Sequence, residues 1–319
     1  MVLALKRVAV TGASGMVGRH IMSALQDINV QVTASARTAP KHQNNFDRFV
    51  SWDLATWQEP EELNQLFPDV DAIVHAGAVV PKPGDNVDVQ NLFDANVRGC
   101  TAIGNWAAQR KLPLINISGA TVYDKAAPMP VREDAPKSSR GAGGFYGFTK
   151  WGGEVALDYF RDDLPFLVHL RPTSIYGSGM SRKSLIGRFL IEAGNDETIS
   201  LTPPVDDRFG LVHAKDVARA TVCALQKRVT GNFNIVGEKP HSLSDVVDAC
   251  IAVTGAGRVM IEEVSANRSA NITFDLDGRH AADVLKYTPA IDLQTGLAEV
   301  WAEMAQSTDH KPNSSISAS

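Results

Sequence analysis

Short apolar runs alternate with longer segments of helical periodicity along the first 170 residues of the chain. The apolar runs predict strands at Val8–Val10, Val30–Ala34, Ala72–Ala76, Leu114–Ser118 and Leu167–Leu170. Helices are expected at Val17–Leu25, at about Asn91–Gln109, and around Tyr146. Because the apolar runs are continuous rather than alternating, they indicate strands that are buried on both faces of a parallel sheet. Strands that are separated by helices predict an α/β fold with a doubly wound sheet.

After Gly177 the alternation of strands and helices becomes less regular, which predicts a smaller second domain. Helical stretches at Ser184–Ala193 and Ser244–Thr254 are mixed with turns, and Gly231–Val236 is expected to return as a late strand to the large sheet. We therefore expect residues 1–176 and 208–236 to form a Rossmann-type dinucleotide-binding domain. Residues 177–207 and 237–306 would form a discontinuous domain over the substrate. The polar, Ser-rich residues 307–319 are expected to be a disordered tail.

Composition narrows the classes of function. The 31 Lys and Arg residues against 36 Asp and Glu give a net charge of −5 without a basic run, so no nucleic-acid partner is expected. No apolar run approaches the roughly 18 residues of a membrane helix, and Met1 leads directly into a strand-like run without a signal peptide. The three widely spaced cysteines suggest a reducing compartment and no metal cluster. These features predict a cytoplasmic protein without a bound metal.

A glycine-rich turn follows the first expected strand. The stretch Thr11–Gly18 places Gly12, Gly15 and Gly18 between a strand and a helix. Such a turn bends tightly, lets the backbone approach phosphates closely, and directs free helix N–H groups at negative charge. It predicts a site for the pyrophosphate of a dinucleotide.

The end of the second expected strand indicates which cofactor binds. A site for NAD usually has Asp or Glu there to accept hydrogen bonds from the ribose. This chain has no acid in Ala34–Arg37, and Arg37 can pair with a 2′-phosphate. We therefore expect NADP, with NAD as the alternative. Asp53, after the third expected strand, is placed to contact the adenine edge.

A tyrosine and a lysine four residues apart suggest proton transfer. Tyr146 and Lys150 share a helix face at i, i+4 spacing. A free phenol has a pKa of about 10, and a neighbouring ammonium favours the phenolate and lowers that pKa. A general acid with a pKa near the working pH is efficient. With the glycine turn upstream, the pair predicts hydride chemistry on a carbonyl or an alcohol.

The chain resembles the extended short-chain dehydrogenases/reductases, the NAD(P)-dependent epimerase/dehydratase family, over roughly residues 5 to 300. Besides the glycine turn and the Tyr146–Lys150 pair, the matching segments are His75–Ala78, Asn96–Thr101, Thr121–Tyr123, Glu133–Pro136, Leu170–Gly177 and Val212–Ala218.

The resemblance implies a role for each matching position. Tyr146 would be the acid/base, and Lys150 would lower its pKa and hold the nicotinamide ribose. The expected cofactor contacts, besides Tyr146 and Lys150, are Gly12, Ser14, Gly15, Met16, Val17, Arg37, Asp53, Leu54, Ala76, Gly77, Ala78, Asn96, Ile117, Pro172, Thr173, Ser174 and Ile175. The implied substrate contacts are Val79, Thr121 and Arg208.

Two departures from the family pattern lie in Ile117–Tyr123. The family usually has its catalytic Ser or Thr at the position of Gly119, so Ser118 is expected to supply this hydroxyl, with Thr121 as the alternative. The 4,6-dehydratase branch has an Asp-Glu pair where this chain has Ala120 and Thr121. This difference argues against a dehydratase.

A third departure concerns the substrate. Members that act on nucleotide sugars commonly have an arginine four residues before the position of His213, where this chain has Phe209, and Arg208 lies one residue earlier. Either a shifted Arg208 binds a diphosphate or the substrate has none. His213 itself is expected to be structural.

Four functions remain open from the sequence. The first is an NADPH-dependent reductase of a keto group, such as that of a nucleotide-linked 4-keto sugar, and the second is a nucleotide-sugar epimerase with bound NAD. The third is a reductase of a small aldehyde or ketone, and the fourth is a non-catalytic NADP-binding regulator. A homodimer is expected because the helices near 91–109 and 145–160 contain apolar residues in excess of one buried face, including Trp106, Trp151 and Phe160.

Overall fold

The structure of the chain is a computed structural model that describes residues 5–40, 45–81, 86–141, 143–263 and 273–306. The tail expected to be disordered, 307–319, lies outside the described residues. No described helix is both long enough and apolar enough to cross a membrane.

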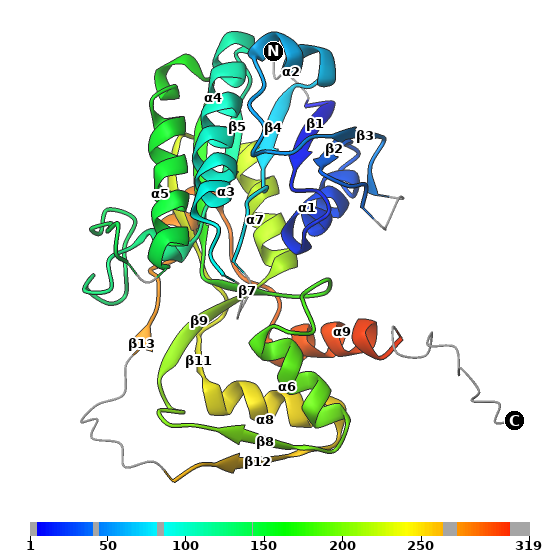
Figure 1. Cartoon of the computed structure of the whole chain (residues 1–319), viewed down its shortest axis with the longest axis vertical. Helices are drawn as coiled ribbons and strands as arrows, with labels where there is room; N and C mark the ends of the chain where they lie inside the picture. Colours follow the sequence, from blue (N-terminus) through cyan, green and yellow to red (C-terminus); the bar gives the residue numbers. More distant parts are fainter. Residues whose placement is uncertain (1–4, 41–44, 82–85, 142, 264–272, 307–319) are drawn as a thin grey trace, which may run out of the picture.

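Within these residues the largest sheet has seven strands, all parallel, in the order β10-β6-β5-β4-β1-β2-β3 (Figure 1). The strands are β1 (Arg7–Thr11), β2 (Gln31–Ala36), β3 (Arg48–Ser51), β4 (Ala72–His75), β5 (Leu114–Ile117), β6 (Leu167–Pro172) and β10 (Gly231–Ile235). Every residue of β4, β5 and β6 is buried. The predicted doubly wound parallel sheet, including the late strand, is confirmed.

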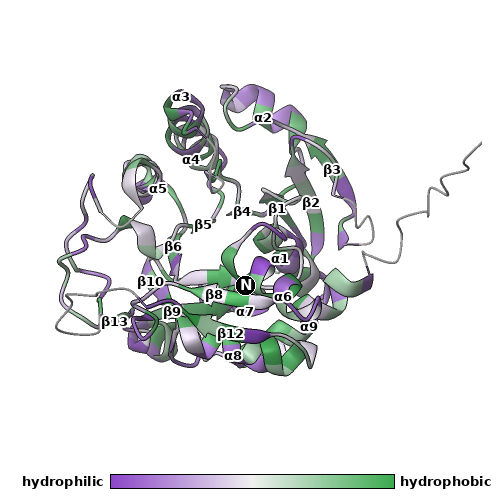
Figure 2. Cartoon of the chain, turned by 60° about the horizontal axis from the view of Figure 1, so that its bottom comes forward, coloured by the Kyte–Doolittle hydropathy of each residue, from purple (hydrophilic) through white to green (hydrophobic). Residues whose placement is uncertain are grey.

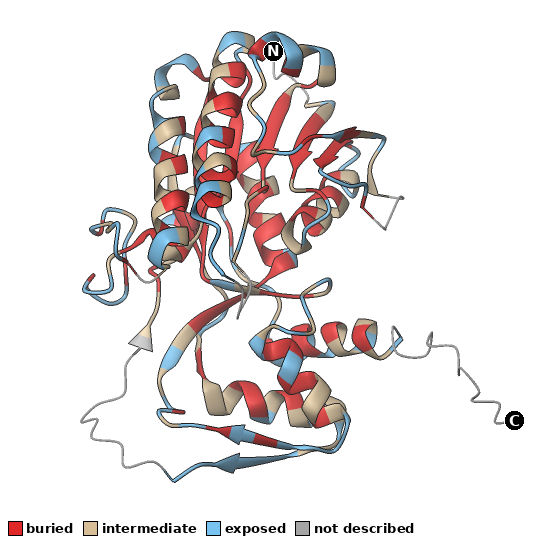
Figure 3. Ribbon diagram, in the orientation of Figure 1, coloured by how far each residue is buried: buried red, intermediate tan, exposed pale blue. Residues whose placement is uncertain are grey.

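Helices cover both faces of this sheet, so that the strands are buried in the centre (Figure 3). The helices on one face are α1 (Met16–Gln26) and α7 (Ala214–Lys227), and those on the other are α2 (Pro60–Leu66), α3 (Val89–Phe93), α4 (Gly99–Arg110) and α5 (Gly144–Asp158). Ile21 and Val217 pack with Val8 and Val10 on the first face. On the second face, Trp106 is part of a separate core cluster. A π-helical stretch, Asp94–Arg98, connects α3 to α4, so the helix predicted near 91–109 runs without a break.

The strand order reverses direction at β1. The chain passes from β1 to β2 and β3 on one side, and then crosses to β4, β5 and β6 on the other side. At such a point the connections after the two central strands lead away from each other and leave a crevice at the carboxyl ends of the strands. The glycine turn follows β1, so it lies at this crevice.

The remaining elements form a second group below the large sheet (Figures 1 and 2). One small sheet pairs β9 (Arg208–His213) with β7 (Ser174–Tyr176), β11 (Pro240–Ser242) and β13 (Thr273–Phe274), and another pairs β8 (Thr198–Leu201) with β12 (Arg258–Ile261). The helices α6 (Leu185–Gly194), α8 (Leu243–Thr254) and α9 (Leu293–Gln306) pack with them around their own apolar cluster. Strand β9, which the expected domain boundary assigns to the dinucleotide-binding domain, pairs in this second group.

Of the aromatic residues expected at a dimer surface, Trp106 is buried and Phe160 is partly buried. Trp106 is 1% exposed and packs against Phe67, and Phe160 lies against the backbone of Gly104, so both residues help to join neighbouring helices. The large exposed apolar side chains within residues 91–109 and 145–160 are Phe93, Phe145, Val155 and Tyr159. The homodimer stays a prediction, but Trp106 is buried and therefore not available at its surface.

Candidate active site

The turn after β1 has backbone geometry that requires glycine. Gly12 has a φ of +68°, and a β-carbon there would stand 2.6 Å from the Ala76 carbonyl group. At Gly18 a β-carbon would stand 2.3 Å from the Gly12 carbonyl oxygen. Helix α1 starts directly after Gly15 without a side-chain cap, so its first N–H groups remain available to an anion. The strand–turn–helix context that a dinucleotide site needs is present.

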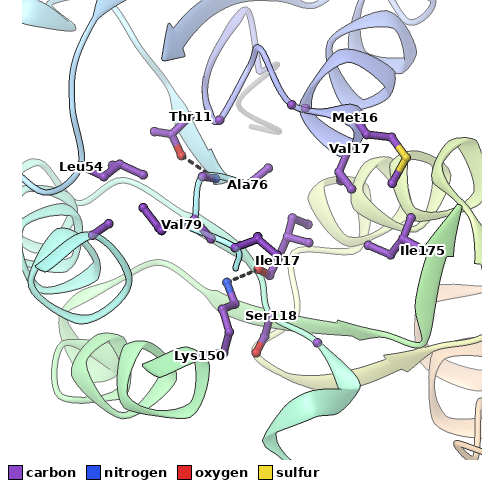
Figure 4. A pocket seen from close by; sticks show the side chains of 18 of the residues that line it. Thr11, Met16, Val17, Leu54, Ala76, Val79, Ile117, Ser118, Lys150 and Ile175 are labelled. Atoms are coloured by element: carbon purple, nitrogen blue, oxygen red, sulfur yellow. Dashed lines mark hydrogen bonds between the residues drawn. The ribbon is translucent and has the colours of Figure 1, made fainter. Parts of the chain in front are cut away.

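A cavity of about 570 Å³ extends from this turn to the start of α5. Its volume is within the range of about 300–1,000 Å³ that is typical of small-molecule sites. All of the residues predicted from the sequence for cofactor, substrate and catalysis line it, except Asn96 and Arg208. Figure 4 labels ten of the residues that line the cavity, among them Thr11, Met16, Val17, Ser118 and Lys150. Lining residues that the sequence prediction missed are Thr11, Ser35, Ala36, Trp52, Val80, Ala95, Gly119 and Ala120.

Thr11, at the end of β1, holds part of the cavity lining in place through its side-chain contacts. Its hydroxyl oxygen accepts a hydrogen bond of 3.3 Å from the Gly77 N–H and lies 2.7 Å from His75 Nδ1 (Figure 4 shows the first contact). Burial lowers the pKa of His75 to about 3, so the ring is neutral and shares a hydrogen bond with the Thr11 hydroxyl. The other ring nitrogen lies 3.4 Å from Cys100 Sγ. This chain of contacts holds the Ala76–Gly77 backbone against the glycine turn.

Arg37 and Asp53 lie where the sequence places them, on the cavity wall after β2 and β3. Arg37 is exposed, and the described part of the chain gives its guanidinium no ion-pair partner. The end of β2 offers no carboxylate to a ribose. The side chain of Asp53 accepts a hydrogen bond of 3.1 Å from the Ala55 N–H and is otherwise open to the cavity.

Tyr146 and Lys150 occupy successive turns at the start of α5, and both line the cavity. Lys150 Nζ donates a hydrogen bond of 2.9 Å to the Ile117 carbonyl oxygen (Figure 4). Burial lowers the pKa of Lys150, while Cys100 and Glu154 act in the opposite direction.

The pKa of the Tyr146 phenol does not follow the sequence-based expectation. Burial raises it to about 12, and no effect of Lys150 opposes this rise. The expectation that Lys150 lowers the pKa of Tyr146 is therefore wrong for the protein alone. The physical cause is burial, which removes water from around the phenol and disfavours its charged form.

Asn96 does not line the cavity, so its predicted cofactor contact is corrected. Its side chain is 2% exposed, and its Oδ1 accepts from the Val79 N–H at 2.8 Å. Its Nδ2 donates to the Val79 carbonyl oxygen at 2.9 Å and to Thr149 Oγ1 at 3.1 Å. Asn96 therefore fixes the backbone of Val79, a residue of the cavity wall.

Arg208 also lies outside the cavity, which corrects its predicted substrate contact. It begins β9, its side chain is about half exposed, and its guanidinium lies 3.3 Å from the Pro240 carbonyl oxygen and 3.5 Å from Asp245. His213, at the other end of β9, is buried and accepts a hydrogen bond from the Lys215 N–H at the start of α7. This contact is a structural helix cap, as expected for His213.

One helical turn after Lys150, a buried ion pair joins α5 to the sheet. The sequence prediction missed this pair. Arg171 of β6 donates from Nε and Nη2 to the two carboxylate oxygens of Glu154 at 2.9 and 2.7 Å. The side chains are 2% and 3% exposed. Burial alone would raise the pKa of Glu154, but the hydrogen bonds and charge of Arg171 bring it below its usual value. Tyr146, Lys150 and Glu154 recur at every fourth residue, and this spacing is the signal in the sequence that could have found Glu154.

No group of three His, Cys, Asp or Glu side chains within the described ranges is arranged to hold a metal ion. The polar side chains of the cavity wall include hydroxyl, phenol, ammonium and guanidinium groups and the carboxylate of Asp53.

Comparison with known proteins identifies relatives of the whole chain. The family model described as the NAD dependent epimerase/dehydratase family matches residues 8–236. A provisionally named UDP-glucose 4-epimerase of Methanocaldococcus jannaschii is 25% identical over 92% of this chain and 96% of that protein. A dTDP-4-dehydro-6-deoxy-D-allose reductase of a Streptomyces species is 24% identical over 92% of this chain and 94% of that protein.

Among solved structures, the fold is similar to that of a UDP-glucuronic acid 4-epimerase from Bacillus cereus in complex with NAD. The TM-score is 0.80 at 22% identity, covering 96% of this chain and 99% of that one. At this identity the likeness concerns the fold, and it confirms the Rossmann-type arrangement of the large sheet.

Proposed function

The chain belongs to the NAD-dependent epimerase/dehydratase family and is an enzyme, and on this basis we propose that it is an NADP(H)-dependent oxidoreductase. Its proposed reaction is the reduction of a keto group on a nucleotide-linked sugar, with Tyr146 as the proton donor. The observation on which the proposal rests is that a single cavity reaches from Arg37, at the end of β2, to Tyr146 and Lys150, on α5.

The residues present fit a dinucleotide. The backbone at Gly12 and Gly18 leaves no room for a β-carbon, so the turn brings main-chain N–H groups close to the cavity. The start of α1 adds the positive end of a helix, which favours a pyrophosphate. Ile175, Ile117 and Ala78 give the same cavity an apolar lining suited to a nicotinamide ring.

Arg37 supports NADP over NAD. An exposed guanidinium without an ion-pair partner in the described chain, beside a strand end that lacks a carboxylate, suits a 2′-phosphate better than two ribose hydroxyls. A charge-assisted contact of this kind is worth about 1.5–3 kcal/mol.

Tyr146 and Lys150 supply the proton chemistry beside the reacting carbon. When bound, the reduced nicotinamide supplies the hydride that the carbonyl carbon accepts. Tyr146 gives its phenolic proton to the carbonyl oxygen as the alcohol forms, and its high pKa keeps the proton in place until then. Lys150 places a positive charge against the carbonyl end of β5 and, by this proposal, holds the ribose and stabilises the phenolate that remains.

A nucleotide-sugar epimerase is the second candidate, because one relative and several similar structures are named as such enzymes. Epimerases oxidise and reduce the same carbon in turn and therefore benefit from a cofactor that stays bound. The same cavity would serve that reaction with Tyr146 accepting and returning the proton.

The experiment is a fluorescence titration of the purified protein with NADPH and NADH side by side, followed by an assay of a substrate panel. The panel contains UDP-glucose, UDP-glucuronic acid, UDP-N-acetylglucosamine, a dTDP-4-keto-6-deoxyhexose, and a small aldehyde and ketone. A preference for NADPH of tenfold or more, about 1.4 kcal/mol, together with NADPH oxidation by the keto sugar, is the expected result. Equal affinities, or NAD retained through purification with epimerisation of a UDP-sugar, would place the epimerase first.

A further inference from the structure

Strand β12 forms an edge of the second group of elements and exposes three consecutive apolar side chains. Figure 1 shows this strand at the end of the group farthest from the large sheet. Within the described part of the chain it pairs with β8 alone. Val259, Met260 and Ile261 are 41%, 51% and 50% exposed. An apolar edge strand of this kind is a template for pairing with another strand.

The main-chain groups of β12 are divided between its two edges. The N–H groups of Arg258 and Glu262 donate hydrogen bonds of 3.3 and 2.9 Å to carbonyl oxygens at the two ends of β8. Because successive residues of a strand direct their main-chain groups to opposite edges, Val259 and Ile261 direct theirs to the open edge. The open edge therefore presents two N–H and two C=O groups to a further strand.

The side chains at the open edge continue an apolar face that is buried at β8. Val259 and Ile261 stand in register with Ile199 and Leu201 of β8, so the four side chains share one face of the small sheet. Ile199 and Leu201 are buried in the apolar cluster with α6 and α8. A strand added beside β12 would extend this face and cover Val259 and Ile261.

The stretch from Arg258 to Glu262 is complementary to itself in the antiparallel direction. Met260 is its centre, with one aliphatic residue on each side, a cation at one end and an anion at the other. About a two-fold axis through Met260, Arg258 of each copy faces Glu262 of the other, and Val259 faces Ile261. The Val259–Ile261 pairs are the hydrogen-bonded ones, because both residues direct main-chain groups to the open edge. Opposite charges across an antiparallel pair stabilise it, and like charges destabilise it.

Other registers lose this match. An axis through Val259 would set Arg258 opposite Met260, and an axis through Ile261 would set Met260 opposite Glu262. Neither axis pairs the two charges with each other. The axis through Met260 alone combines two hydrogen-bonded aliphatic pairs with two pairs of opposite charge.

Both charges remain able to take a further partner. Arg258 Nη2 lies 3.5 Å from Asp196 Oδ2, and both side chains are about two-thirds exposed. Glu262 Oε2 accepts a hydrogen bond of 2.8 Å from Thr202 Oγ1. A guanidinium has five N–H donors and a carboxylate has about four acceptor positions, so these contacts leave both groups with free capacity.

We propose that β12 is a pairing surface for a second copy of this chain, which adds antiparallel about a two-fold axis through Met260. The two copies then share a four-stranded sheet whose central strands are the two β12, and the same residues serve on both sides of the interface. None of the residues 258–262 lines the cavity, so the pairing is independent of the proposed function. It is also separate from the helices near 91–109 and 145–160, for which the sequence predicted a homodimer.

The test measures the molar mass of Arg258→Glu, of Glu262→Arg and of their equimolar mixture by sedimentation velocity at low ionic strength, where charge pairs are least screened. Each single reversal places like charges opposite each other twice and should halve the mass relative to wild type. The mixture restores both opposite-charge pairs between unlike chains and should regain the wild-type mass. The control is Arg132→Glu, because the Arg132 side chain has the same 66% exposure as Arg258 and a similar surface ion pair, and it should keep the wild-type mass.

The axis through Met260 also predicts one specific cross-link. The two Met260 residues form a non-hydrogen-bonded pair, in which the α-carbons lie about 4.5 Å apart, a separation that a disulfide spans. Met260→Cys should therefore give disulfide-linked dimers under mild oxidation. Ser200→Cys is the matched control, because Ser200 is exposed and in register with Met260 but lies one strand farther from the axis, and it should stay unlinked.

Three results would overturn the inference. The first is the same mass for wild type and Arg258→Glu, and the second is a mixture that keeps the mass of the single reversals. The third is equal cross-linking of the two cysteine variants. Because the mixture and the cysteine variants report pairing directly, a reversal that merely disturbs folding does not mimic the expected pattern. The readouts need neither NADPH nor substrate, so failure of the proposed function would leave them unchanged.

Discussion

Lys150 of α5 donates a hydrogen bond of 2.9 Å to the carbonyl oxygen of Ile117, the last residue of β5 (Figure 4). This contact places a positive charge at the carboxyl end of a central strand, one helical turn from Tyr146. Ile117 also lines the part of the cavity where we propose that the nicotinamide lies. In the proposed function, Lys150 would share this contact with a ribose hydroxyl when the cofactor binds.

Replacing Lys150 with Met should separate the role of Lys150 in cofactor binding and catalysis from its effect on stability. The substitution shortens the unbranched side chain by one atom and removes a buried charge, so the free energy of unfolding is expected to stay level or rise. The affinity for NADPH should fall at least tenfold and kcat by about 10²-fold, because both the ribose contact and the charge beside the phenol are lost. Calorimetry, fluorescence titration and steady-state assays measure the three quantities. Lys111→Met, at an exposed lysine paired with Asp163, is the control that should change none of them.

Arg37→Ala should weaken NADPH selectively. The guanidinium is expected to contact only the 2′-phosphate, so the Kd for NADPH should rise tenfold or more and the Kd for NADH should stay within twofold. A parallel rise for both cofactors would mean that Arg37 acts on the shared part of the dinucleotide. No change for either would make Arg37 an ordinary surface residue and favour NAD.

Glu154→Gln should destabilise the protein by about 3–5 kcal/mol, because the Arg171 guanidinium is left buried without a counter-charge. Urea denaturation at pH 7 measures the change. The matched control is Asp94→Asn, which removes the more exposed pair with Arg98 on a helix surface and should change stability by less than about 1 kcal/mol. A difference of less than about 1 kcal/mol between the two variants would contradict the importance of the buried pair.

The same pair gives a signed pH dependence. The pKa of Glu154 is lower in the folded than in the unfolded protein, because the hydrogen bonds and charge of Arg171 outweigh the opposing effect of burial. Its contribution to stability is therefore complete above the unfolded value of about 4.3 and disappears as the pH falls through the folded value. Wild-type stability should decline below about pH 4.5, and Glu154→Gln should show a smaller decline. A pH profile of the variant that parallels that of wild type would assign the acid sensitivity to other carboxylates.

Tyr146 should not ionise near neutral pH in the protein without cofactor. Burial raises its pKa to about 12, because the phenolate is poorly solvated in the cavity wall. The difference in tyrosinate absorbance between wild type and Tyr146→Phe should therefore stay flat up to about pH 11. A step in that difference between about pH 6 and 9 would show that Lys150 lowers the phenol pKa without help from a ligand.

The sequence predicted the parallel sheet and the glycine turn because both depend on local constraints. Continuous apolar runs such as Ala72–Ile73–Val74 have few alternatives to a strand buried on both faces. At Gly12 the positive φ and the close approach of Ala76 leave only glycine. Positions at strand ends, such as Arg37 and Asp53, follow from the topology and were placed correctly on the cavity wall.

The incorrect predictions concern side-chain direction and long-range pairing. Asn96 was expected at the cofactor, but a contact 17 residues distant in sequence, with the Val79 backbone, uses its amide. Arg208 points to Asp245 of α8, which no local pattern indicates. The pair of Glu154 and Arg171 likewise depends on how far α5 lies from β6, a distance that only the folded sheet defines.

The central claim is that Tyr146 is the proton donor in a cavity that binds NADP(H), and one comparison tests it most directly. The kcat of Tyr146→Phe is measured on the panel compound that wild type turns over fastest, and the Kd for NADPH is measured on the same preparation. Loss of the phenolic proton should lower kcat by about 10²- to 10⁴-fold and leave the Kd within twofold. Full activity in this variant would contradict the account, because some other group would then have to supply the proton.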